Sequence, residues 1–267
     1  METVPVIKKL TEDRYEARLA DQDDDILSAL RLRYRVFVEE MGAEGPGVDH
    51  ASRTERDEFD AIFDHLVLVD RTRDPGLGDH VVGVYRLLPC DRMPGIGRFY
   101  SESEFDLSLL KSSGRRLLEL GRSCIHADHR GGTGMFLLWN ALARYVLERD
   151  IDILFGAASF PGTDLVELSV PLSFLHHAHL APPSLRVRSH GVGAGKVHLL
   201  PPEKVDRRSA LAATPALIRA YLRLGGFVGE GVFVDHAFNT TDVCLVMDTH
   251  QMSQKHKEFY IRKGEAG

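Results

Sequence analysis

Apolar residues recur at strand and helix spacing in the N-terminal part of the chain. Residues 15–20 alternate between apolar and polar side chains, as in a strand with one buried face. Between residues 27 and 41 apolar side chains recur every three or four positions, and three aspartates at 23–25 precede them, where negative charge favours a helix N-terminus. The pattern predicts a strand followed by an amphipathic helix that ends near Gly42.

The segment that follows this helix shows no periodicity. Residues 43–56 contain glycine, proline and charged side chains, a composition typical of a loop. Because loops of this length often cover a functional site, a lid is one hypothesis for this segment.

The middle and C-terminal parts of the chain alternate between strand and helix patterns. Two β-branched runs, at residues 65–69 and 81–88, flank a turn segment and predict a hairpin with a long loop. Further strands are predicted over 117–125, 151–158, 231–234 and 243–247, and further helices over 135–149, 164–175 and 209–224, the last interrupted or started by Pro215.

These elements predict an α/β (α+β) protein. Strands that meet first as a hairpin, and then through a helical crossover, favour a mixed, mostly antiparallel sheet with helices on both faces. The 267 residues are enough for one sizeable core, so we expect a single domain of residues 1–267 with a basic helical extension around residues 183–226.

Composition excludes several classes of protein. The formal net charge of -6 argues against a nucleic-acid binder, because neutralising phosphates requires a basic surface. The longest apolar runs, at 136–139 and 151–160, are shorter than the roughly 20 residues that span a bilayer. Residues 1–10 contain no apolar signal core, and the three cysteines are widely spaced, so we expect a cytosolic protein with reduced thiols.

Positive charge gathers in one later segment. Residues 186–223 carry eight basic side chains against only Glu203 and Asp206. The segment could bind an acidic partner or anionic lipid head groups, and a solvated face balanced elsewhere is the alternative.

One pair of charged residues could serve acyl transfer to an amine, which requires an uncharged amine and a donor for the developing oxyanion. Glu119 and Arg122 lie in the predicted strand 117–125, where alternation places them on opposite faces. A bulge at Gly121 would bring the two charges together. An ordinary solvent-facing strand pair is the alternative.

Other charged residues could bind a substrate. Asp57 and Asp60 flank Phe59 at the end of the predicted loop, where carboxylates suit a cationic amino acid or form a solvated acidic loop. Arg86 lies on an otherwise apolar strand and must therefore find a carboxylate or a carbonyl, either in a core network or on a substrate.

Three further patterns are weak. The glycine-rich residues 129–134 precede a helix and resemble a pyrophosphate cradle. The histidines at 176, 177 and 179 imitate metal ligands, but adjacent positions point apart on a helix, so no metal site is predicted. Cys124, His126 and Asp128 imitate a nucleophile with its base, although triad members usually come from separate elements.

Longer stretches form recognisable motifs. They are LRLRYRVFVEEMG at 30–42, DEFD at 57–60, VGVYRLL at 82–88, FYSESEFD at 99–106, ELGRSC at 119–124, LFGAASFPGTD at 154–164, LHHAHLAP at 175–182 and FNTTDVC at 238–244. Together they resemble the ornithine acyl carrier protein N-acyltransferases over roughly residues 12–250.

The resemblance implies a GNAT-type fold, kinship with acylhomoserine lactone synthases and the first step of ornithine lipid synthesis. In that step a 3-hydroxyacyl chain is joined to the α-amine of L-ornithine. The implied catalytic residues are Glu119, which would accept the ammonium proton directly or through water, and Arg122. The implied substrate-binding residues are Arg33, Phe37, Asp57, Asp60, Arg86, Ser123 and Asp164.

The implied acyl donor is acyl carrier protein. The wider GNAT pattern for CoA is Arg-x-x-Gly-x-Gly/Ala, but counting from Arg130 places Thr133 at the first glycine. We therefore expect no resident cofactor, only a carrier-bound 3-hydroxyacyl thioester as co-substrate. The acidic carrier would meet a basic surface made by Arg186, Arg188, Lys196, Lys204, Arg207 and Arg208.

The long acyl product would partition into the bilayer, so we expect peripheral attachment to the inner, cytoplasmic membrane. Three alternatives remain open at this point: an acylhomoserine lactone synthase, a CoA-dependent acetyltransferase, and a catalytically silent binder of carrier protein or lipid. The histidine-rich block and the segment after residue 200 argue against the first, and intact Glu119 and Arg122 argue against the last.

Overall fold

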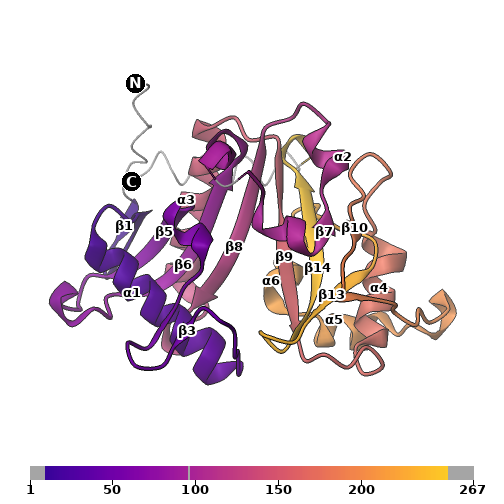
Figure 1. The fold of residues 1–267 in the computed structure, drawn as a ribbon, viewed down its shortest axis with the longest axis horizontal. Helices are drawn as coiled ribbons and strands as arrows, with labels where there is room; N and C mark the ends of the chain where they lie inside the picture. Colours follow the sequence, from indigo (N-terminus) through magenta and orange to yellow (C-terminus); the bar gives the residue numbers. More distant parts are fainter. Residues whose placement is uncertain (1–9, 96, 252–267) are drawn as a thin grey trace. The chain divides into compact units, whose positions relative to one another are not determined.

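The structure is a computed structural model that describes residues 10–95 and 97–251 (Figure 1). The described residues pack as two compact units: the first contains residues 10–88 together with Leu120–Ile151, and the second contains Pro89–Glu119 and residues 152–251. The single domain expected over residues 1–267 therefore stays a prediction. Residues 1–9, on which the expected absence of a signal depends, lie outside the described part.

The first unit is built on strands in the order β1-β2-β5-β6-β8. The pairs β1/β2, β2/β5 and β5/β6 are antiparallel, and β5/β6 is the hairpin predicted from the β-branched runs. The bounds are Leu10–Glu12 for β1, Tyr15–Leu19 for β2, Asp64–Asp70 for β5, Val81–Pro89 for β6 and Leu117–Ile125 for β8, whose residues from Leu120 onward belong to this unit.

Helices cover both faces of this sheet, as predicted. Val67 of β5 belongs to the same buried cluster as residues of α1 (Asp23–Arg33). Its neighbour Leu68 packs on α3 (Gly132–Glu148), because a Cβ on Gly134 would lie 3.0 Å from its Cδ2. Successive side chains of a strand point to opposite faces, so the two helices lie on opposite sides.

The first helix is longer than α1 alone and ends where the sequence predicted. After Arg33 the chain continues as the wider helix η1 (Tyr34–Glu40), and Gly42 follows with a φ of +78°. Glycine tolerates this left-handed conformation, which commonly terminates helices.

The segment predicted as a loop or lid contains a short hairpin, β3 (Val48–Asp49) with β4 (Thr54–Glu55). Glu55 is only 1% exposed, so the end of this segment is fixed in the first unit.

The second unit contains the strand order β8-β9-β14-β13-β11, with β12 paired to β14. Strands β8 and β9 are parallel through the register Leu117↔Ile153 to Glu119↔Phe155, and α3 connects them, which confirms the predicted strand, helix, strand unit. The other pairs are antiparallel. The bounds are Ile153–Pro161 for β9, Thr240–Asp248 for β14, Val232–Asp235 for β13, Ala194–Gly195 for β11 and Phe227–Val228 for β12.

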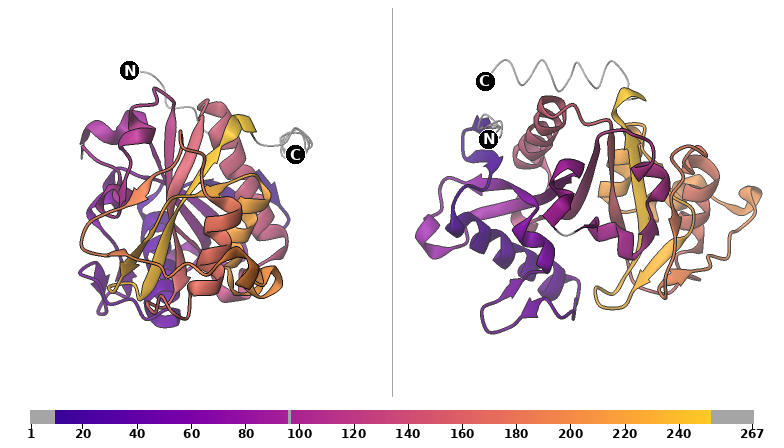
Figure 2. Two further views of the ribbon diagram at one scale, coloured as in Figure 1. Left: turned by 90° about the vertical axis from the view of Figure 1, so that its right-hand side faces the viewer. Right: turned by 45° about the horizontal axis from the view of Figure 1, so that its top comes forward.

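The basic segment is helical only in part. Helices α5 (Arg207–Ala213) and α6 (Ala216–Arg223) are separated at Pro215, as its position suggested, and α5 lies beside α4 (Ser169–His179) (Figure 2). The remaining short elements are η2 (Glu58–Ala61), η3 (Pro75–Leu77), η4 (Cys90–Gly95), η5 (Tyr100–Ser103), β7 (Phe105–Asp106), α2 (Ser108–Lys111), η6 (Ala127–His129), β10 (Arg188–Ser189), η7 (Pro202–Lys204) and η8 (Thr249–Gln251). Among the described residues, no helix combines the length and apolar character needed to cross a bilayer.

Candidate active site

An alternating network of arginines and carboxylates is buried in the first unit. Arg33, at the end of α1, donates from Nε to Glu55 Oε2 over 2.6 Å and from Nη1 to Asp60. The Arg33 side chain is completely buried, so these two carboxylates must compensate its positive charge. The sequence predicted Arg33 as a site residue but gave no signal for Glu55, a polar residue in a segment without periodicity.

Asp57 and Asp60 organise the start of η2. Asp57 Oδ1 accepts the Phe59 N–H over 3.0 Å, while Asp60 Oδ2 accepts the Asp57 N–H over 2.8 Å. Both carboxylates also bind Arg86 Nη1, at 2.5 and 2.8 Å. Arg86 therefore has the carboxylate partners that its place on an apolar strand requires, and its guanidinium lies over the Phe63 ring, 4.7 Å from the centroid. Its predicted role in substrate binding stays a prediction.

Arg122 joins the same network through an unusual backbone conformation. Its φ is +47°, a left-handed value in the middle of β8 and directly after Gly121. This conformation is uncommon for a residue with a Cβ, and it changes the direction of the side chain, as a β-bulge does. From it, Arg122 reaches Glu55 Oε1 at 3.3 Å and Asp57 Oδ2 at 3.1 Å.

These contacts keep the carboxylates ionised. Burial alone would raise the pKa of Glu55, Asp57 and Asp60, but the neighbouring guanidiniums outweigh it and hold all three pKa values below the ordinary range. Burial also lowers the pKa of His65, whose Nε2 lies 3.2 Å from the Asp60 carbonyl oxygen. The network thus balances three arginine charges with three carboxylate charges.

Glu119 lies in the second unit and is almost fully buried. Its carboxylate accepts the Tyr100 N–H over 2.8 Å, the Ser101 N–H over 2.7 Å and the Ser101 hydroxyl over 2.5 Å. These three donors fix the carboxylate at the start of η5. Such a group is suited to accept a hydrogen bond from a substrate ammonium.

The other predicted substrate-binding residues have varied settings. Phe37, on η1, packs against the buried cluster beneath α1. Ser123 is half-buried on β8. Asp164 is exposed and accepts the Val166 N–H over 2.8 Å, which stabilises the turn before α4.

The predicted carrier-binding residues divide into two groups. Arg186 is half-buried and donates to the Ala181 carbonyl, and Arg188 pairs with Glu230 at 3.0 Å. Lys196, Lys204, Arg207 and Arg208 are exposed, as is Arg188. Lys204 lies just before α5, and Arg207 and Arg208 begin α5.

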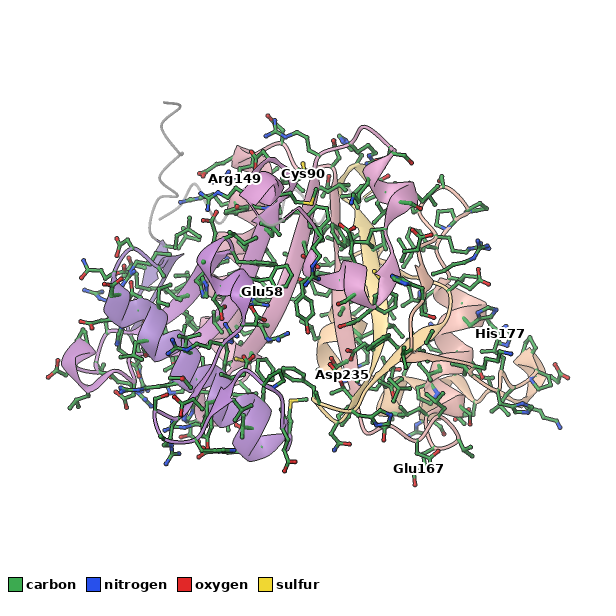
Figure 3. The ribbon with its side chains drawn as sticks, viewed as in Figure 1. Glu58, Cys90, Arg149, Glu167, His177 and Asp235 are labelled. Carbon is green, nitrogen blue, oxygen red and sulfur yellow. The ribbon has the colours of Figure 1, made fainter. Side chains whose placement is uncertain are left out.

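Cys124, which imitates a nucleophile in the sequence, is buried. Burial raises the pKa of Cys124 to about 12, so its thiol stays protonated at neutral pH. The histidine-rich block lies on α4, where the exposed His177 points outward (Figure 3) and its Nε2 lies 2.8 Å from the Leu200 carbonyl oxygen.

A pocket of about 340 Å³ lies in the second unit beside α4. Its walls are mainly aliphatic side chains and glycines, and Lys196, Glu230 and His176 add polar groups. Cavities of this size and character commonly bind small molecules. The aliphatic lining residues are Leu172, Leu175, Val197, Leu199, Val228, Val232 and Val243.

Known structures share this architecture. Residues 32–140 match the Acetyltransferase (GNAT) domain family. The N-acyl amino acid synthase FeeM, from uncultured soil microbes, is 13% identical with a TM-score of 0.50, covering 92% of this chain and 98% of that chain. The CoA-dependent acyl-homoserine lactone synthase BjaI is also 13% identical with a TM-score of 0.50, covering 90% of this chain and 82% of that chain. The fold is that of the GNAT-type transferases, as predicted.

Closer relatives identify the family. The L-ornithine N(alpha)-acyltransferase of Rhodobacter capsulatus is 59% identical over 251 residues, which cover 94% of this chain and 96% of the relative. That of Rhizobium meliloti is 40% identical over 92% of this chain and 83% of the relative. The chain belongs to the L-ornithine N(alpha)-acyltransferase family and is an N-acyltransferase, which confirms the resemblance in its motifs.

Proposed function

We propose that this enzyme transfers a 3-hydroxyacyl group from acyl carrier protein to the α-amine of L-ornithine, giving lyso-ornithine lipid. The observation that carries the proposal is the 59% identity, over 94% of the chain, to a relative named for L-ornithine and for the α nitrogen.

Glu119 is the proposed acceptor for the substrate α-ammonium. The ammonium must lose one proton before nitrogen can attack, and Glu119 accepts it directly or through water. The nitrogen then forms a C–N bond to the thioester carbon, the C–S bond breaks, and the second proton of the nitrogen passes to the departing carrier thiolate, which leaves as the thiol. Tyr100 and Ser101 hold the Glu119 carboxylate in place for this step.

The network around Arg122 supports the reaction by holding the backbone from β4 to η2 in place. Arg33, Arg86 and Arg122 bind Glu55, Asp57 and Asp60, which orders the segment from β4 to η2. Since arginine charges already compensate Asp57 and Asp60, we assign these two carboxylates an ordering role rather than the main recognition of a cationic side chain.

The pocket beside α4, with its aliphatic lining residues, is the proposed site for the acyl chain. Its aliphatic walls suit a fatty chain, and the polar side chain of Lys196 at its border also belongs to the predicted carrier surface. The exposed Lys204, Arg207 and Arg208 would attract the acidic carrier.

No resident cofactor is needed for this reaction, because the thioester itself activates the acyl group. The product would remain at the inner-membrane surface, each buried methylene contributing about 0.8 kcal/mol to partitioning. We therefore propose a cytoplasmic enzyme attached peripherally to that membrane.

The decisive assay supplies the purified enzyme with 3-hydroxyacyl carrier protein and, separately, L-ornithine, L-lysine or L-glutamine. We expect a product with ornithine, and its fragmentation in mass spectrometry should place the acyl group on the α nitrogen. Absence of an ornithine product would refute the substrate, and equal turnover with the matching acyl-CoA would refute the carrier requirement.

A further inference from the structure

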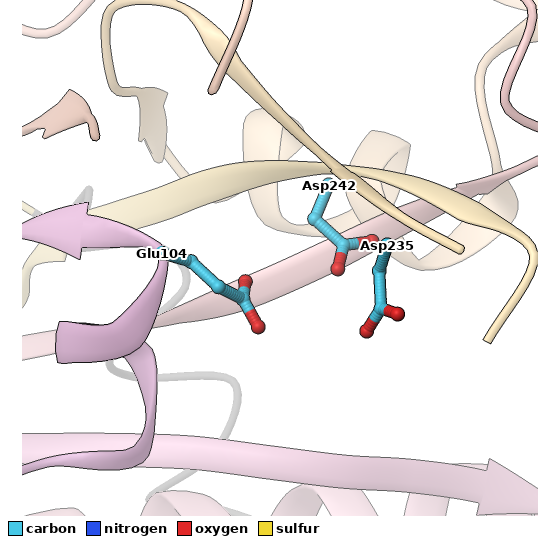
Figure 4. A group of neighbouring side chains, drawn as sticks. All are labelled: Glu104, Asp235 and Asp242. Carbon is cyan, nitrogen blue, oxygen red and sulfur yellow. The ribbon is translucent and has the colours of Figure 1, made fainter. Parts of the chain in front are cut away.

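Three carboxylates converge in the second unit, outside the arginine network. Glu104 follows η5, Asp235 ends β13 and Asp242 lies within β14, and one oxygen from each lies within 4.8 Å of the others (Figure 4). Glu104 and Asp242 are 3% and 4% exposed, and Asp235 is half-buried. Carboxylates this close together in a poorly solvated place favour a positive charge beside them. Asp235 Oδ1 also accepts the Ala237 N–H over 2.8 Å and the Phe238 N–H over 3.1 Å.

A buried hydroxyl on the same face points to a ligand for this cluster. Thr240 is directly opposite Asp235 in the β13/β14 register and two residues before Asp242, so all three side chains project from one face of the sheet. Thr240 is 2% exposed, and its Oγ1 has no hydrogen-bond partner among the described residues. Buried hydroxyls are nearly always hydrogen-bonded, so this oxygen marks a position for a donor.

Glu119 and the cluster lie on one face of the sheet in the second unit, because Glu119 is paired with Phe155 in the β8/β9 register and Phe155 with Val246 in the β9/β14 register. Cys244 is the next residue on this face of β14, and burial raises the pKa of its thiol. The charges of both Glu119 and Glu104 raise the pKa of Cys244 further. On this face of β14, Cys244 lies between Asp242 and Val246, and Val246 is in the row of Phe155 and Glu119.

We propose that Glu104, Asp235 and Asp242, with the Thr240 hydroxyl, bind the side-chain ammonium of the amino-acid acceptor. The inference rests on the proposed function, since it requires that the acceptor be a diamino acid such as ornithine. An ammonium has three N–H donors and no acceptor, which matches a set made only of oxygen acceptors.

This assignment explains how one of two primary amines is selected. A protonated amine has no lone pair and does not attack a thioester. Carboxylates around the side-chain nitrogen favour its charged form, so that amine stays an ammonium while the α-amine is deprotonated at Glu119. The cluster thus selects the α nitrogen through both position and protonation state.

The test compares L-ornithine with L-norvaline, which has the same carbon chain but no side-chain amine. The variants are Asp235→Asn, Glu104→Gln, Asp242→Asn and Thr240→Val, with Glu167→Gln on the exposed turn before α4 as the matched control (Figure 3). We expect each carboxylate variant to lower kcat/KM for ornithine by about 10- to 100-fold, the range for a lost charge-assisted hydrogen bond. Turnover of norvaline and both activities of the control should not change.

Several outcomes would overturn the proposal. Equal losses with ornithine and norvaline would assign the cluster a structural role, and unchanged ornithine turnover would exclude it from binding. Tight Ca²⁺ or Mg²⁺ binding by the wild type, lost in the variants without a change in ornithine preference, would make it a metal site. The half-buried Asp235 is the variant expected to fold best, and retained norvaline turnover reports folding in every variant.

A binding measurement separates this inference from the proposed function. L-ornithine should raise the melting temperature of the wild type and of Glu167→Gln but not that of Asp235→Asn, whether or not acyl transfer occurs. If the wild type acylates no ornithine, the proposed function fails, and the thermal shift still decides the ammonium site.

Discussion

Arg33 Nε lies 2.6 Å from Glu55 Oε2, and both side chains are almost completely buried. The pair joins the end of α1 to β4, and Arg122 binds the other oxygen of the same carboxylate. Removing one member of such a buried pair leaves the partner charge without compensation, which costs more than the intact pair contributes.

Glu55→Gln should therefore destabilise the protein strongly. The substitution keeps the shape of the side chain but removes the negative charge between Arg33 and Arg122, so we expect the free energy of unfolding to fall by about 3–5 kcal/mol. Urea denaturation measures the change. The exposed Glu44→Gln is the matched control and should change stability by less than about 0.5 kcal/mol. A Glu55→Gln variant as stable as the wild type would show that the network does not hold the segment.

Stability should fall in acid because of the same network. The pKa values of Glu55, Asp57 and Asp60 are lowered in the folded protein, from ordinary values of 4.5, 3.8 and 3.8. These three carboxylates contribute their full stabilisation of the folded protein when the pH is above their ordinary pKa values. The contribution is lost as the pH falls toward their lowered pKa values in the folded protein, because the unfolded chain then binds more protons. Urea midpoints should be level near neutral pH and fall below about pH 4.5. An Asp60→Asn variant should show a shallower acid dependence, and an unchanged slope would contradict the assignment.

Thiol reactivity should distinguish one cysteine from the other two. Cys124 and Cys244 are buried with raised pKa values, whereas Cys90 is partly exposed (Figure 3). Because the thiolate is the reacting form, a disulfide reagent should modify one thiol per folded chain at pH 8 and all three in urea. Cys90→Ser should abolish the fast reaction and leave acyl transfer intact. Rapid modification of Cys124 in the folded enzyme would contradict its burial.

Glu119→Gln should affect the chemical step. Loss of the proposed proton acceptor should lower kcat by about 10²- to 10⁴-fold, the usual contribution of general-base catalysis. Ser101→Ala removes one of the three donors to the carboxylate and should lower kcat much less. Steady-state kinetics with both variants, alongside their melting temperatures, tests the role. Equal kcat in Glu119→Gln and the wild type would refute it.

Charge reversal on the basic surface proposed to bind the carrier should change the KM for the acyl carrier protein only. We expect Lys204→Glu, Arg207→Glu and Arg208→Glu together to raise KM for the acyl carrier protein by at least about 10-fold, because attraction to the acidic carrier becomes repulsion. KM for ornithine should stay constant, and the difference in KM for the carrier should shrink as salt screens it. Arg71→Glu, on an exposed turn of the first unit, is the control. Equal effects of the two changes would argue against a specific carrier surface.

The sequence by itself determined the local elements and the family. The hairpin β5/β6, the unit β8-α3-β9 and the division at Pro215 follow from periodicity, β-branched residues and chain breakers, which act over a few neighbouring positions. The need of Arg86 for a carboxylate was also predictable, because an arginine on an apolar strand has few other solutions.

Only the tertiary structure decided which carboxylates meet. Glu55 comes from a segment without periodicity, and Glu104 joins Asp235 and Asp242 from more than a hundred residues away. Such groups come together through strand register and chain topology, which depend on the packing of the whole core rather than on local preference. The charged side chains that carry the proposed chemistry are therefore visible in the sequence, but their partners are set by the fold.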